Sequence, residues 1–213
     1  MSRAVVVDLG GPRRCLSSAV LGGGLRSATH WLNLQVVHGY RRRDPAAHLE
    51  QEARRRGLAP ATVVGMLTAA DVGAIQRRVR PGVVAHATVG IGQPLAAAGR
   101  LPRAVPRAGT INVLVVVDAG LCDAALVGAA QTATEAKAQA LADAGVRAIN
   151  HVGAATGTAT DALCVAAAPG GDEPFAGPAT AVGAAIAGAV HEAVLAGALA
   201  WRRAVELGEA SRP

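Results

Sequence analysis

A short polar segment, Thr156–Asp161, stands out in an otherwise apolar chain because it combines three hydroxyls with a carboxylate. If it is extended, the two-residue period of a strand places Thr156, Thr158 and Thr160 on one face and Asp161 on the other. Such groups can bind a polar substrate, supply a nucleophile or accept a proton. The structural alternative is a strand that begins with β-branched residues and an Asp that caps a turn. The segment is therefore a candidate substrate-binding edge with a carboxylate close by.

Lys137 is the one lysine in the chain, whose other basic residues are arginines. Helical periodicity over residues 123–144 places Lys137 on the inward stripe and Glu135 about 180° away, toward solvent. A partly buried ammonium needs an anionic partner or loses its charge, and either state can stabilise an oxyanion or transfer a proton. A structural ion pair with Asp118 or Asp161, or a long stem that reaches water, is the alternative. Lys137 is thus a candidate catalytic residue.

Residues 110–118 form the clearest β-strand pattern in the sequence, with polar residues near both ends. A two-residue period places Thr110, Asn112 and Asp118 on one face. The other face consists of Ile111, Val113, Val115 and Val117. An aspartate at the end of a strand is either a catalytic base or the cap of the helix that follows. The pattern therefore predicts a buried strand whose ends carry candidate site residues.

Local motifs argue against a metal site and a nucleotide-phosphate site. Neither CxxC nor HExxH occurs, and Leu195 stands where His191 would need a second histidine. Leu95 replaces the third glycine that would complete GxGxxG after Gly90, and no Walker pattern is present. The three cysteines are odd in number and widely spaced, and the N-terminus lacks a signal-peptide profile. We therefore expect a cytoplasmic protein without a metal-binding motif, and its cofactor requirement stays open.

The composition is that of a folded domain, with 51% hydrophobic and 17% charged residues among 213. This balance excludes an intrinsically disordered chain, and the length suits a single domain over residues 1–213. Only four aromatic residues occur, too few for the stacking platforms of proteins that bind single-stranded nucleic acid. The net charge of +6 comes from arginines scattered through different segments, which favours solubility over a nucleic-acid site.

Strand patterns and helical patterns together predict an α+β fold, with a mixed and largely antiparallel sheet packed by Ala-rich helices. The expected strands are Arg3–Asp8, Cys15–Val20, His30–Val37, Thr62–Leu67, Val83–Thr88, Thr110–Asp118 and Thr158–Ala168. The expected helices are Pro45–Arg56, Asp123–Ala144 and the segment Ala179–Trp201. The last helix could be mistaken for a membrane span, but its apolar residues form one stripe and charged residues lie at its middle. We therefore predict no membrane span.

Eight sequence segments, which in order cover nearly the whole chain, together resemble the adenosylcobinamide amidohydrolase family of corrinoid salvage. They are CLSSAVLGGG (15–24), NLQV (33–36), MLTAADV (66–72), ATVGIG (87–92), GTINVLVVVDAGL (109–121), TATEAKAQAL (132–141), TGTATDALCVA (156–166) and AGPATAVGAAIAGAVHEAV (176–194). The resemblance implies an enzyme that hydrolyses the linear amide joining aminopropanol to a corrin side chain of adenosylcobinamide. The implied product is adenosylcobyric acid, which re-enters cobalamin biosynthesis. The alternative is a non-catalytic corrinoid-binding or carrier protein.

Amide hydrolysis requires a nucleophile or activated water, a donor to the oxyanion and an acid for the leaving amine. Polar residues of the matched segments can fill these roles. The catalytic candidates are Asp161, Asp118, Lys137 and Thr158. The substrate-binding candidates are Asn112, Thr110, Thr156, Thr160, Ser17, Ser18 and Glu135. Among these, the two aspartates are alternative bases, Lys137 or Asn112 would support the oxyanion, and Thr158 or Thr160 would be the nucleophile or a substrate contact.

One loop departs from the pattern expected of the family. Gly92-Gln93 stands where many relatives would carry Ser-Asn, so a hydroxyl contact from this loop is absent or replaced and the corrinoid preference is open. Because aromatic residues are scarce, a corrin would rest on aliphatic and glycine surfaces, with Arg103 or Arg107 of the loop Gly99–Gly109 at the rim. The expected partner is the small-molecule corrinoid, with no nucleic acid, and a homo-oligomer is left open.

Overall fold

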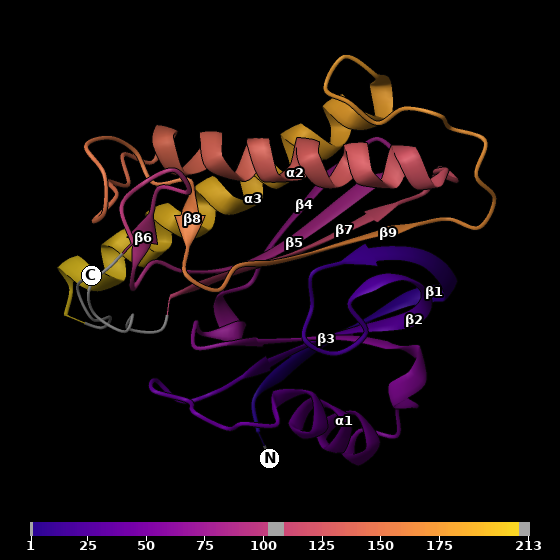
Figure 1. Cartoon of the computed structure of the whole chain (residues 1–213), viewed down its shortest axis with the longest axis horizontal. Coiled ribbons are helices and arrows are strands. Elements are labelled where there is room, and N and C mark those ends of the chain that lie inside the picture. The colour runs from indigo at the N-terminus through magenta and orange to yellow at the C-terminus, as the bar shows by residue number, and fades with distance from the viewer. Residues whose placement is uncertain (1, 102–108, 209–213) are drawn as a thin grey trace.

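The computed structural model describes residues 2–101 and 109–208. Within these ranges, one sheet has seven strands in the order β3-β2-β1-β9-β7-β5-β4, and β6 pairs with β8 in a second sheet (Figure 1). Most neighbouring strands are antiparallel, while β2–β3 and β7–β9 are parallel. The predicted α+β class, with a mixed and largely antiparallel sheet, is confirmed.

The bounds of these elements are as follows. The strands are β1 (Ala4–Ser17), β2 (Gly24–Gln35), β3 (Val63–Thr68), β4 (Gln76–Arg80), β5 (Val83–Gly90), β6 (Pro94–Leu95), β7 (Thr110–Val117), β8 (Gly157–Thr158) and β9 (Ala162–Ala167). The helices are α1 (Pro45–Arg55), α2 (Asp123–Asp143) and α3 (Ala181–Glu206), with short 3-10 turns η1 (Pro60–Thr62) and η2 (Val72–Ala74).

The first strand is longer than the sequence pattern predicts. Two separate strands, Arg3–Asp8 and Cys15–Val20, were expected, but β1 continues through Gly10-Gly11-Pro12 and ends at Ser17. Both glycines have positive φ, 74° and 121°, and the pairing with β2 shifts register between Asp8 and Arg13. Glycine adopts this backbone conformation at little cost, so the chain bulges without ending the strand.

The central strand β7 has the two faces that its alternation predicts. Ile111, Val113, Val115 and Val117 lie in the main core cluster together with residues of α2 and α3. Leu114 lies on the other face, in a second cluster with Trp31 and Cys164. Figure 1 shows α2 and α3 as one layer over β4, β5, β7 and β9, whereas α1 lies at the far side of the molecule, next to β3.

The helix α3 has the length and the mean hydropathy, 1.6, of a helix that could cross a membrane. Its fully buried residues nevertheless form one stripe, which includes the predicted Ile186, Val190 and Val194. This stripe packs in the core with α2 and with strands of the sheet. The packing supports the interpretation of α3 as an amphipathic helix on a core.

The sheet curls so that β3 approaches β7 across the second core cluster. The Asn112 side-chain amide on β7 donates to the Leu67 carbonyl on β3 at 2.9 Å and to Asn33 Oδ1 on β2 at 2.8 Å. The Asn33 amide in turn donates to Thr88 Oγ1 on β5 at 2.9 Å. Asn33, Thr88 and Asn112 are fully buried. This network therefore ties the two halves of the curled sheet together.

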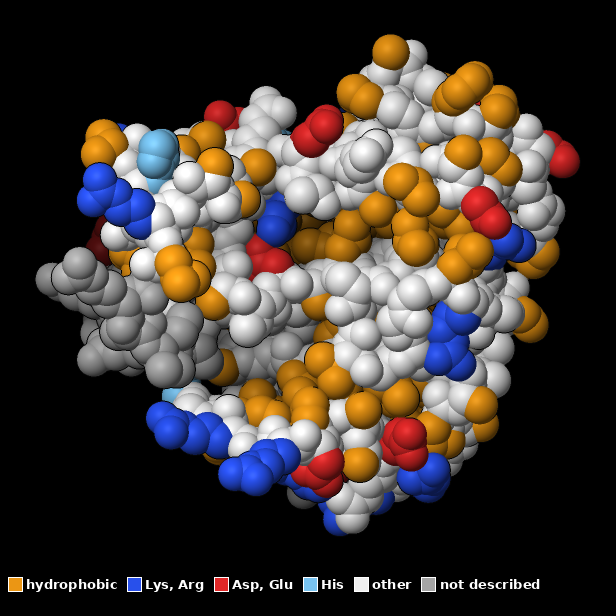
Figure 2. Space-filling model, in the orientation of Figure 1, with side chains coloured by type: hydrophobic (Ala, Val, Ile, Leu, Met, Phe, Trp, Pro, Cys, Tyr) orange, Lys and Arg blue, Asp and Glu red, His pale blue; other side chains and the backbone are white. Residues whose placement is uncertain are grey.

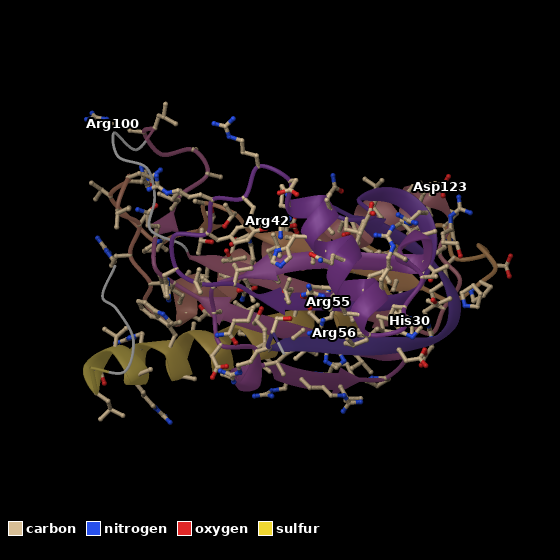
Figure 3. The ribbon with its side chains drawn as sticks, turned by 90° about the horizontal axis from the view of Figure 1, so that it is seen from below. His30, Arg42, Arg55, Arg56, Arg100 and Asp123 are labelled. Atoms are coloured by element: carbon tan, nitrogen blue, oxygen red, sulfur yellow. The ribbon has the colours of Figure 1, made fainter. Side chains whose placement is uncertain are left out.

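The N-terminal segment is held to α1 by Glu52, a buried carboxylate that accepts hydrogen bonds from Ser2, Arg55 and Arg56. Figure 3, viewed from below, shows the two arginines beside α1. Burial alone would raise the pKa of Glu52, but the hydrogen bonds from Ser2 and the arginines outweigh it and lower the pKa to about 2.

A carboxyl whose pKa falls on folding stabilises the protein above its unfolded-state pKa and loses that contribution as the pH falls through its folded-state pKa. We therefore expect the free energy of unfolding of the wild type to decrease between about pH 5 and pH 2. The free energy of unfolding of the Glu52→Gln variant should decrease less over the same range. Urea unfolding of both proteins at pH 7 and pH 3 measures this difference. Identical pH dependence in the two proteins would show that Glu52 makes no such contribution.

Candidate functional site

The polar segment Thr156–Asp161 turns instead of forming one extended strand. Gly157–Thr158 belongs to β8, residues 159 and 160 form a turn, and β9 begins at Ala162. The turn brings Thr158 and Asp161 to the same side: the Thr158 N–H donates to Asp161 Oδ2 at 3.0 Å, and the Thr158 hydroxyl lies 2.5 Å from Asp161 Oδ1. The expectation that Asp161 would point away from Thr158 is therefore wrong, because it assumed an extended backbone.

Lys137 on the helix α2 forms an ion pair with Asp161, one of the two partners that the sequence suggested for it. Its Nζ lies 2.5 Å from Asp161 Oδ2, and the two side chains are only 15% and 14% exposed. The buried residues of α2 flank Lys137, with Ala133, Ala136 and Ala140 in the main core cluster. The periodicity that predicted an inward-facing ammonium is thus confirmed, and the lysine and the Thr-Asp segment converge at one place.

The acceptor sites of the Asp161 carboxylate are fully used. A carboxylate offers about four lone-pair sites. On Oδ1, one faces the Ile111 N–H at 2.9 Å and one faces the Thr158 hydroxyl. On Oδ2, one faces Lys137 and one faces the Thr158 N–H. Two of these donors are backbone N–H groups and a third is the Lys137 ammonium, so the Thr158 hydroxyl is the neutral side-chain donor beside Asp161. Its single proton can point to Asp161 Oδ1 or to the Gly109 carbonyl, 2.7 Å away.

The Gly109 carbonyl contacts two threonine hydroxyls of the segment. It lies 2.7 Å from Thr158 Oγ1 and 3.1 Å from Thr160 Oγ1, and Thr160 Oγ1 is also 2.7 Å from Thr110 Oγ1. Thr156 lies farther out, where its hydroxyl accepts from the Ala97 N–H at 2.9 Å. Thr110 and Thr160 therefore position the turn on the start of β7, while Thr156 fixes the strand pair β6–β8.

Gly157 leaves room for the ion pair. A Cβ atom at this position would lie 2.8 Å from Lys137 Nζ and would also collide with Asp161 Oδ2. The backbone of Gly157 does not have positive φ, so the absence of a side chain is what this site requires. Gly157 was not among the sequence candidates, although it directly precedes the candidate Thr158, and this position was the signal that could have identified it.

We expect Gly157→Ala to lower kcat/KM by about tenfold to a hundredfold, because it displaces the Lys137 ammonium from Asp161. Gly128→Ala is the matched control, since a Cβ there would approach no atom closer than 3.9 Å and adds the same methyl group to α2. The measurement is kcat/KM of both variants on the amide substrate. Equal values for the two would mean that the position of the ion pair does not matter for turnover.

Several sequence candidates lie away from this cluster. Asp118 follows the opposite end of β7, where its carboxylate is exposed and lies 3.4 Å from Arg13. Asn112 is fully buried, and its side-chain amide donates hydrogen bonds to Asn33 Oδ1 and to the Leu67 carbonyl. Glu135 is on the side of α2 that faces α3, in a cavity of about 340 Å³. The structure brings none of these three to the Lys137–Asp161 pair.

Ser17 and Ser18 support the cluster through the backbone of β9. The Ser17 hydroxyl donates to the Leu163 carbonyl at 2.8 Å, and Ser18 Oγ accepts from the Leu163 N–H at 3.1 Å. Leu163 is two residues from Asp161. The two serines therefore fix the position of the strand that carries Asp161.

The loop that departs from the expected family pattern lies beside the site. A Cβ on Gly109 would lie 2.7 Å from the backbone nitrogens of Gly92 and Gln93, so this loop packs directly against Gly109. Gln93 Oε1 is buried and has no hydrogen-bond partner among the described residues. The predicted rim residues Arg103 and Arg107 lie outside the described residues.

Comparison with known proteins gives a consistent result. The family model for adenosylcobinamide amidohydrolase matches residues 1–206. A protein of that name from Methanosarcina mazei is 32% identical over 190 residues, which cover 84% of this chain and 88% of the relative. Another from Halobacterium salinarum is 34% identical over 203 residues, covering 90% of this chain and 83% of the relative. On the strength of a match that includes every residue of the Thr158–Asp161–Lys137 cluster, the chain belongs to the adenosylcobinamide amidohydrolase family.

Proposed function

We propose that this chain hydrolyses adenosylcobinamide at the amide between aminopropanol and the corrin side chain, giving adenosylcobyric acid. The observation that carries this proposal is the cluster of Thr158, Asp161 and Lys137, in a chain that belongs to the amidohydrolase family named for that substrate. A nucleophile, a base within hydrogen-bond reach and a third group that orients the base form the arrangement that activates a hydroxyl.

Thr158 is the nucleophile in this mechanism. The three fixed donors leave Asp161 one acceptor site, which faces the Thr158 hydroxyl at 2.5 Å, so this is the proton that Asp161 is placed to accept. As the proton passes to Asp161, Thr158 Oγ forms a bond to the amide carbon. The carbon–nitrogen bond then breaks, and the aminopropanol nitrogen takes the proton. Water hydrolyses the resulting ester, which releases the acid and restores the Thr158 hydroxyl.

Lys137 supplies the positive charge beside the reacting carbonyl. An ammonium has three N–H donors, and among the described residues Asp161 is its one hydrogen-bond partner. The remaining donors are free to bind the oxygen that becomes negative when the amide carbon is attacked. In a water-poor site such a charge contributes more than it would in bulk water. Asp161 therefore has two tasks, to accept the Thr158 proton and to hold the ammonium in place.

The test is incubation of the purified protein with adenosylcobinamide, followed by chromatographic separation of the products. The proposal predicts equal amounts of adenosylcobyric acid and free aminopropanol, formed in proportion to the protein added. Binding of adenosylcobinamide without either product would contradict it.

We also propose that the chain works in the cytoplasm. All three cysteines are free thiols, although Cys15 and Cys164 lie together in the second core cluster on neighbouring strands. Unpaired thiols are typical of a reducing compartment. Fractionation of the source cells tests the proposal: the chain should follow a cytoplasmic marker, and recovery from the membrane or the medium would contradict it.

A further inference from the structure

Two ion pairs tie one side of α2 to the sheet. Asp123, at the start of α2, lies 2.5 Å from Arg14 on β1, and Lys137 lies 2.5 Å from Asp161 before β9. These helix positions are fourteen residues apart, which is about 21 Å at 1.5 Å per residue. The two pairs therefore mark the ends of a long strip between α2 and the strands β1 and β9.

The α2 side of this strip is open. Helical spacing from Asp123 places Val127, Ala130, Thr134 and Lys137 on the same side, at intervals of four, three, four and three residues. Val127 is 50% exposed, Thr134 is exposed and Ala130 is half-buried. The fully buried residues of α2 lie to the core side of this line, and Lys137, only 15% exposed, stands where the line meets the core. The other flank of the helix faces α3. No described element thus covers the strip on the α2 side.

The floor of the strip is apolar and also open. Leu16 on β1 pairs directly with Leu25 on β2 and with Val165 on β9, so the three side chains share one face of the sheet. Leu16 is half-buried against the main core cluster and Leu25 is 46% exposed. Figure 2 shows a hollow below α2, lined with hydrophobic side chains, with one basic and one acidic side chain together at its left end. We call this strip the α2 groove.

We propose that the α2 groove binds the corrin ring of the substrate. The inference rests on the proposed function, which places the amide at Thr158, Asp161 and Lys137. On one side of that cluster, Thr158 pairs with Pro94 and Gly157 with Leu95, so β6 already fills the space. The groove continues on the other side. The ring must therefore extend from its reacting side arm along the groove.

The chemistry of the groove suits a corrin. A corrin is a broad macrocycle whose edge carries methyl groups and amide side arms. Leu16, Leu25 and Val127 offer aliphatic surface for the methyl-bearing edge, and burial of such area is favourable at about 25 cal/mol per Å². The Arg14 guanidinium at the far end is 44% exposed, and it has N–H donors that can serve amide carbonyls.

The experiment compares wild-type protein with Val127→Trp, which fills the groove from α2, and Leu25→Glu, which places a charge on its floor. Ala142→Trp adds a tryptophan to the exposed surface of α2 beyond Lys137, outside the groove, and is the matched control. For each protein, KM and kcat are measured with adenosylcobinamide. The dissociation constant is also measured for adenosylcobyric acid, which contains the ring but not the aminopropanol amide.

We expect both groove variants to raise KM and to weaken adenosylcobyric acid binding by about tenfold or more, a loss of about 1.4 kcal/mol, with kcat within about twofold of wild type. The control should match wild type. Unchanged KM and unchanged product binding in both groove variants would overturn the inference while leaving the proposed function intact. If Val127→Trp does not fold, Leu25→Glu decides alone. Wild-type protein that forms no product but binds adenosylcobyric acid in the groove would instead refute the proposed function.

Discussion

Replacement of Asp161 by asparagine is expected to lower kcat on adenosylcobinamide by about a thousandfold, which corresponds to about 4 kcal/mol. The asparagine keeps the shape of the side chain but cannot accept the Thr158 proton, and it removes the negative partner of Lys137. The free energy of unfolding should fall less, by about 1–3 kcal/mol, because the neighbouring donors lose part of their hydrogen bonding. Steady-state kinetics and urea unfolding of the same preparation give both quantities.

The comparison for this variant is Asp118→Asn, the other carboxylate that the sequence offered as a base. Asp118 is exposed at the far end of β7, beside Arg13, so its amide variant should keep kcat within about twofold of wild type, as surface ion pairs contribute little. Equal losses of activity in the two variants would remove Asp161 from the mechanism. Equal losses of activity and stability in Asp161→Asn would make that residue structural.

The second large effect is expected at Thr158. Thr158→Val has nearly the same shape but no hydroxyl, and it should lower kcat by about a thousandfold or more, since the attacking atom is gone. Thr158→Ser keeps the oxygen and should retain a measurable fraction of the wild-type rate. Product formation is followed for all three proteins, and mass spectrometry of protein quenched during turnover shows whether the corrin acyl group is bound to the chain.

A valine variant that turns over at the wild-type rate would contradict the role of Thr158 as nucleophile. Thr158 Oγ1 also lies 2.7 Å from the Gly109 carbonyl and so can hold the turn in place. If that were its only role, the loss of activity in each variant would follow the loss of stability. The serine variant separates the two roles, because it restores the hydroxyl without the methyl group. An acyl adduct that appears in wild type and is absent from the valine variant supports the covalent step.

The part of the site that periodicity controls could be predicted from the sequence. The helix was expected over residues 123–144 and spans Asp123–Asp143, and its period placed Lys137 inward, where it meets Asp161. The alternation of β7 likewise placed Val113, Val115 and Val117 on one face, and the structure packs that face in the core with α2 and α3. Both predictions depend on one local repeat over a long, uninterrupted element, which is the most dependable signal in a sequence.

Features that depend on turns and on long-range pairing could not be predicted. The turn at residues 159–160, which brings Thr158 to Asp161, is set by their mutual hydrogen bonds and by Gly109, fifty residues away. The edge strand β4 was missed because QRRVR lacks an apolar run, although Pro81-Gly82, with a glycine φ of 68°, marks the hairpin. Asn112 looked like a site residue because the sequence cannot show that β3 folds over it.

The central claim is that Lys137 and Asp161 act as one unit in amide cleavage, and a double-mutant cycle tests it most directly. The cycle measures kcat for wild type, Lys137→Met, Asp161→Asn and the double variant, all with adenosylcobinamide. Each single variant already breaks the unit. The kcat of the double variant should therefore lie within a few-fold of the kcat of the slower single variant. Losses that multiply in the double variant would show that the two residues act independently and would contradict the claim.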